Sequence, residues 1–89
     1  MNSSAKKKIQ NALSIVPIIY ANHRQTQSCK EFLEHHEWKL ALESLIELDN
    51  ETEYTFPKEF WKQLEEAADR MFIKDVSQYC KLKAADNSA

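Results

Sequence analysis

Apolar residues recur at spacings of three and four along most of this chain, the pattern of helices that each bury one face. Glycine is absent, which disfavours tight hairpin turns because they need residues that accept positive φ. The pattern therefore predicts an all-α fold, a small bundle of four main helices with a short helix at the C-terminal end. The expected helices span residues 4–21, 28–36, 38–49, 57–72 and 75–82.

At 89 residues the chain forms a single domain, residues 1–89, because it is too short to divide a hydrophobic core in two. We expect its ends, residues 1–3 and 84–89, to be disordered. The facing apolar stripes of consecutive helices predict one shared core. Its expected members are Trp38, Leu42, Leu45, Phe60, Leu64 and Met71.

Local signals predict the boundaries of the first two helices. Pro17 either kinks the first helix or ends it, because proline lacks the amide donor and disfavours a helical residue before it. Residues 22–26 are polar and predict the first loop. Ser28 followed by Glu31 matches a capping box, which would begin the second helix.

The segment 28–50 has two interpretations. Its apolar stripe changes face near residues 36–38, so the segment is either one helix or two helices with a break at that point. Residues 49–56 are polar and acidic without a sustained period, and they predict the main loop. A second capping-box pattern, Asp75 with Gln78, would begin the last helix.

Negative charge is concentrated in the middle of the chain. Residues 1–30 hold five basic residues and no acidic one, whereas residues 31–69 hold twelve carboxylates against three lysines, a net of nine negative charges. A surface of this kind attracts basic partners and repels nucleic acid. The charge distribution therefore indicates a protein-binding module.

The sequence gives little support to other classes of function. The lack of glycine removes the Gly-rich nucleotide-binding motifs, and a few short helices form only shallow grooves, so we expect no enzymatic activity, no cofactor and no small-molecule substrate. The longest early apolar run, residues 13–20, is too short for a bilayer, which takes about 20 residues, so no membrane association is expected.

Cysteine and histidine placement argues against a metal site. Cys29 and Cys80 do not form a close ligand pair, and a helix points the neighbours His35 and His36 about 100° apart. No secretion signal is recognisable, which favours a cytoplasmic location. In that reducing compartment the two cysteines are expected to be free thiols.

Two stretches of the chain resemble a known family. Residues 36–45, HEWKLALESL, an acidic loop after them, and residues 57–71, PKEFWKQLEEAADRM, are similar to the small helical immunity proteins of contact-dependent growth inhibition and Maf-type toxin systems. The likeness covers about half of the chain, and the glycine often found before the Ala–Leu pair in that family is missing here. The resemblance implies a cytoplasmic bacterial inhibitor that binds and blocks one cognate toxin domain, often a ribonuclease.

The charge distribution leads to the same kind of partner. A nuclease presents a cationic cleft to phosphates, and an acidic protein surface can occupy or flank that cleft. We therefore expect occlusion of the toxin without chemistry, with a tyrosine on the acidic loop as an aromatic anchor. The candidate partner-binding residues are Glu31, Glu34, Glu37, Glu43, Glu47, Asp49, Glu51, Glu53 and Tyr54.

A helical adaptor or regulatory subunit of another protein complex is the alternative, since it would carry the same amphipathic stripes. Exposed apolar residues on two opposite faces would favour the adaptor, whereas an acidic face with few apolar anchors would favour the immunity protein. A helical transcription regulator would need a basic recognition helix, and the sequence does not contain one.

Overall fold

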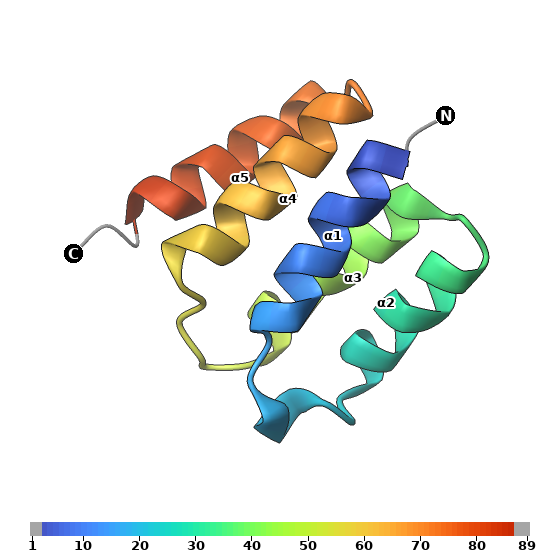
Figure 1. The fold of residues 1–89 in the computed structure, drawn as a ribbon. Coiled ribbons are helices and arrows are strands. Elements are labelled where there is room, and N and C mark those ends of the chain that lie inside the picture. The colour runs from blue at the N-terminus through green and yellow to red at the C-terminus, as the bar shows by residue number, and fades with distance from the viewer. Residues whose placement is uncertain (1–2, 87–89) are drawn as a thin grey trace.

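The computed structural model describes residues 3–86, and within them the chain folds into α-helices without any strand. The helices are α1 (Ser3–Ile15), α2 (Arg24–Glu34), α3 (Trp38–Glu51), α4 (Lys58–Arg70) and α5 (Lys74–Asp86), with a short 3₁₀ turn η1 (Ile18–Tyr20) between the first two (Figure 1). The all-α class is thereby confirmed, and the helix count agrees approximately with the expected four main helices and one short one.

The helices form two antiparallel pairs with α1 between them (Figure 1). In one pair α2 packs on α3, and in the other α4 packs on α5. The first helix packs along α4 and also contacts α3, so it joins the two pairs. Both α3 and α5 contact α4, but neither packs broadly against the other.

Each helical pair turns through a residue in the left-handed region, His36 at φ 58° and Phe72 at φ 59°. In the first turn the amide of Glu37 donates to the carbonyl of Phe32 at 2.9 Å, and the second turn repeats this pattern. This is the Schellman helix ending, which usually employs glycine. The segment 28–50 therefore belongs to two helices, the second of the two interpretations, and the break lies at residues 35–37.

The first helix ends before Pro17. It stops at Ile15, and Pro17 then takes an extended conformation as the N-cap of η1. A proline cannot donate the helical hydrogen bond, and it disfavours helical backbone at Val16, so the chain restarts as a tighter turn. The expected helix over residues 4–21 is thus shorter, and Pro17 ends it.

The second helix begins earlier than expected. His23 is its N-cap, and its ring Nδ1 accepts a hydrogen bond from the amide of Gln25 at 3.1 Å. The predicted loop at 22–26 therefore ends at His23, and Thr26 is buried inside the helix. The predicted capping box from Ser28 is wrong, because Ser28 lies within α2 rather than at its start.

The last helix is longer than expected. It begins at Lys74, so the predicted capping box from Asp75 is not its start, and it continues to Asp86. Residues 84–86 were expected to be disordered but are helical. Ala84 packs into the core, and its burial stabilises the last turn of the helix. Ser3 likewise is the first residue of α1, while residues 1–2 and 87–89 lie outside the described residues.

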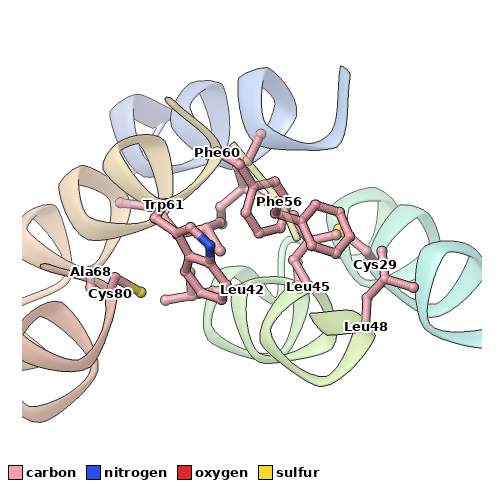
Figure 2. Packing of buried hydrophobic residues seen from close by; sticks show 14 of the residues in the cluster. Cys29, Leu42, Leu45, Leu48, Phe56, Phe60, Trp61, Ala68 and Cys80 are labelled. Atoms are coloured by element: carbon pink, nitrogen blue, oxygen red, sulfur yellow. The ribbon is translucent and has the colours of Figure 1, made fainter. Parts of the chain in front are cut away.

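The core spans both helical pairs (Figure 2). Four of its predicted members are fully buried, whereas Trp38 and Met71 are only partly buried at its edge. Trp38 is the first residue of α3 and Met71 is the C-cap of α4, so each lies beside a turn where neighbouring helices no longer shield it from solvent. Phe56, which the sequence pattern placed in the main loop, is also fully buried, and its ring stacks on that of Phe60 at a centroid distance of 4.3 Å. Trp61, on the apolar stripe of α4, is fully buried as well. The predicted members that are fully buried are Leu42, Leu45, Phe60 and Leu64.

Candidate protein-binding site

A groove of about 490 Å³ runs between α3 and α5. It exists because both helices lean on α4 without packing broadly on each other. The α3 wall presents positions 43, 46, 47 and 50, which share one helical face by their spacing. The lining residues, called the acidic groove below, are Glu43, Ile46, Glu47, Asn50, Asp75, Val76 and Tyr79.

The apolar part of the acidic groove is fixed by the core beneath it. Ile46 and Val76 are partly buried and pack against the core from the two walls. Tyr79 is 38% exposed, and its ring lies edge to face with the ring of Trp61 at 6.1 Å. The groove thus offers an aliphatic and aromatic surface that is already held in place.

The charged part of the acidic groove is entirely negative. Glu43, Glu47 and Asp75 line it, and no lysine, arginine or histidine is among its lining residues. Within residues 3–86 none of these three carboxylates forms an ion pair, and Glu47 accepts only a long hydrogen bond of 3.5 Å from the Asn50 amide. Their charge therefore faces solvent without internal compensation.

Two of the predicted partner-binding acids are occupied inside the molecule. Asp49 is 12% exposed and lies 3.3 Å from the ammonium of Lys83. Glu51 accepts hydrogen bonds from Arg24 at 3.1 and 2.9 Å and from Gln25 at 2.9 Å. Both lie on α3 rather than on the predicted loop, because the helix extends to Glu51. Their charges are compensated by Lys83 on α5 and by Arg24 on α2, so they are less available to a partner.

The acids of the second helix lie elsewhere. Glu31, Glu34 and Glu37 are exposed, but α2 ends at Glu34, so the three do not share one continuous helical face. Glu34 lines a shallow hollow together with Lys6 and Lys30, where the charge is mixed. In Figure 1 this helix lies on the far side of the molecule from α5, so these acids do not join the acidic groove.

Glu53 and Tyr54 lie on the loop between α3 and α4, as expected. Tyr54 is partly exposed, and its ring is held edge to face by Phe56 at 4.8 Å and by Tyr20 at 5.9 Å. With Lys83 nearby, both residues line a polar hollow separate from the acidic groove. Of the nine predicted residues, the structure therefore brings only Glu43 and Glu47 into the groove.

The three most exposed large apolar side chains of residues 3–86 lie at two ends of the bundle. Ile18 and Ile19 on η1 are 91% and 79% exposed, and Phe72 in the α4–α5 turn is 90% exposed. Figure 1 shows η1 and the α4–α5 turn at opposite ends of the molecule. The sequence pattern assigned Ile18 and Ile19 to a helix and so did not reveal this exposure.

Grouped metal ligands, membrane-spanning helices and exposed thiols are the other functional features to consider in residues 3–86. No three residues among His, Cys, Asp and Glu are grouped there to hold a metal ion, and no helix there has the length and apolar content to cross a membrane. Cys29 and Cys80 are buried free thiols, as expected. Burial raises the pKa of each thiol to about 12, so at neutral pH neither is a thiolate nucleophile.

Comparisons of the chain with protein families, with characterised proteins and with solved structures find no match. The chemistry of the acidic groove is therefore the main guide to what this protein does.

Proposed function

We propose that this protein binds a basic partner protein through the acidic groove and, as the resemblance implies, neutralises a cognate toxin domain by occlusion. The observation that carries the proposal is the set of three carboxylates, Glu43, Glu47 and Asp75. They converge beside an apolar surface and form no ion pair with any other residue of 3–86. Protein interfaces combine an apolar centre with a polar rim in this way.

A basic nuclease is the toxin class that this surface fits best. Its active-site cleft has to attract phosphates, so it carries positive charge that an acidic protein can cover. Opposite charges also steer the encounter and raise the association rate, which favours rapid capture of a lethal partner. Neutralisation needs no catalytic group in this protein.

The first prediction tests this proposal with the product of a neighbouring gene that co-purifies with the protein and has nuclease activity. Reversing Glu43 and Glu47 to Lys should lower the affinity by about tenfold or more and abolish protection, because both charges face the partner. Association with the unaltered protein should slow steeply as salt is added, since free charges are screened beyond about 8 Å at physiological ionic strength.

Reversal of Glu31 and Glu34 to Lys is the matched control, since it makes the same charge change on α2, outside the acidic groove. It should slow association modestly and leave protection intact. Equal affinity and protection in the groove variant, with helical content unchanged and association independent of salt, would reject the proposal.

A helical adaptor is the second candidate, and the exposed apolar ends favour it. Ile18 and Ile19 lie at one end and Phe72 at the other, as a protein bridging two partners would require. Replacing Ile18 and Ile19 by Ser separates the two candidates. Loss of partner binding in that variant, with binding retained in the groove variant, would favour the adaptor.

A further inference from the structure

We infer that the acidic groove receives an arginine side chain of the partner, in preference to lysine. The inference rests on the proposed function, because it specifies which chemistry the partner brings to the groove. An arginine has a long aliphatic stem and a planar cationic head, and such side chains bury the stem along apolar surface while the head meets charge.

The acidic groove offers a surface to each of these two parts, and both of its walls contribute to each surface. Ile46 and Val76 offer aliphatic contact for the stem. Glu43 and Glu47 stand one helical turn apart on α3, and Asp75 adds a third carboxylate from α5. A guanidinium has five donors in a rigid fork, so it can serve more than one carboxylate at once, which an ammonium does less well.

Tyr79 gives the second reason for arginine. Its ring is partly exposed in the groove and is braced against Trp61. A guanidinium stacks on aromatic rings and is more weakly hydrated than an ammonium, so it loses less on entering a partly apolar site.

The protein itself contains an example of a guanidinium bound by a carboxylate. Arg24 donates to both carboxylate oxygens of Glu51, through Nε at 3.1 Å and Nη2 at 2.9 Å. The guanidinium of Arg24 thereby engages one carboxylate in a bidentate pair. The acidic groove presents the same acceptors with no cation of residues 3–86 among its lining residues.

The test compares nona-arginine and nona-lysine peptides, which carry the same charge, by titration into the whole protein followed by backbone NMR. Nona-arginine should bind about fivefold or more tightly than nona-lysine, and its largest shifts should fall on residues 43–50 and 75–79. Tyr79→Leu keeps an apolar side chain but removes the ring, so the arginine preference should shrink towards equal binding.

Neutralised variants locate the binding. Glu43→Gln with Glu47→Gln should weaken nona-arginine binding about tenfold, whereas Glu31→Gln with Glu34→Gln should change it by about twofold or less. Equal binding of the two peptides, equal losses in both variants, or shifts centred on α2 would overturn the inference. Dimerisation of the protein alone through residues 43–50 and 75–79 would also overturn it, since a second copy would then fill the groove.

Failure of the inference and failure of the proposed function give different results. If the groove variant loses toxin protection but neither peptide is preferred, the groove binds the toxin without an arginine. If nona-arginine is preferred and the groove variant still protects against the toxin, the groove prefers arginine, but the toxin is neutralised through another surface and the proposed role of the groove is wrong.

Discussion

Phe72 combines two properties that are each costly for a single residue. Its backbone lies in the left-handed region at φ 59°, and its ring is 90% exposed. A non-glycine residue in that region costs about 1–2 kcal/mol, and an exposed ring recovers nothing by burial. Glycine would satisfy the turn at lower cost, so the fold alone does not explain the phenylalanine.

We expect Phe72→Gly to raise the free energy of unfolding by about 0.5–1 kcal/mol, because relief of the strain exceeds the added freedom of the unfolded chain. Urea unfolding measures the change. Phe72→Ala is the control, since it removes the same ring but keeps the Cβ atom that causes the strain. A glycine variant no more stable than the alanine variant would mean that the turn is not strained.

At single residues, the sequence predictions were wrong where an uncommon residue type occupies a helix cap or a helix-ending turn. His23 caps α2 through its ring nitrogen, whereas sequence rules look for Ser, Thr, Asp or Asn at that place. Ser28 fits those rules instead, because its spacing to Glu31 matches a capping box by coincidence inside the helix. His36 and Phe72 in turns that usually hold glycine were equally hidden.

At the scale of elements, the α2–α3 pair is closed at both ends. The turn through His36 joins one end, and at the other Arg24 at the start of α2 binds Glu51 at the end of α3. The hydrogen bonds from Arg24 and then Gln25 hold the pKa of Glu51 below its usual value. Glu66 on α4 has a pKa lowered in the same sense, chiefly by its hydrogen bond from Lys8 on α1.

The lowered pKa of Glu51 predicts how stability depends on pH. Since the folded state holds this carboxyl's pKa below the unfolded value, its contribution is present above the unfolded pKa and is lost as pH falls through the folded one. Glu51→Gln should therefore lower stability at neutral pH and flatten the acid limb of the curve. Urea midpoints measured from neutral pH downward would show this.

Glu53→Gln is the matched control, because Glu53 is two positions further on and forms no ion pair within residues 3–86. Its acid limb should resemble that of the unaltered protein. An unchanged acid limb in Glu51→Gln would contradict a role of the Arg24 pair in stability.

Most elements were predictable because their apolar stripes are regular, and the last helix shows where that signal weakens. In α5 only Cys80 and Ala84 are buried, while Tyr79 is 38% and Leu82 is 56% exposed. The apolar positions of α5 therefore do not predict which of its faces packs against the rest of the protein. Its length depends on packing along α4, which the local sequence does not encode.

For the whole molecule, the core that spans both pairs should respond strongly to truncation. Leu42 on α3 and Leu64 on α4 are fully buried, and we expect Leu→Ala at either site to cost about 2–5 kcal/mol. This is a large share of the total of about 5–15 kcal/mol typical of a domain. Leu82→Ala, at a site 56% exposed, is the control and should cost far less by urea unfolding. Losses below about 0.5 kcal/mol at both buried sites would contradict the packing.

The candidate site was only partly predictable, because charge along the chain does not fix which charges meet in space. The acidic block was clear in the sequence, yet Asp49 and Glu51 are paired internally. Asp75, outside that block, joins Glu43 and Glu47 through the position of α5. The charge of the surface was therefore predictable, and the groove was not.

The position of α1 between the two pairs affects how the chain folds during its synthesis. This helix buries Ala5, Ile9 and Ala12, and its main partner is α4, which the ribosome makes only after residues 16–57. The α2–α3 pair can close first, since its contacts are local, while the larger part of the apolar side of α1, which packs on α4, stays uncovered. A chain that stops before α4 leaves that side open to chaperones and proteases. Once α4 has been translated it covers that side, and the chain becomes resistant to degradation.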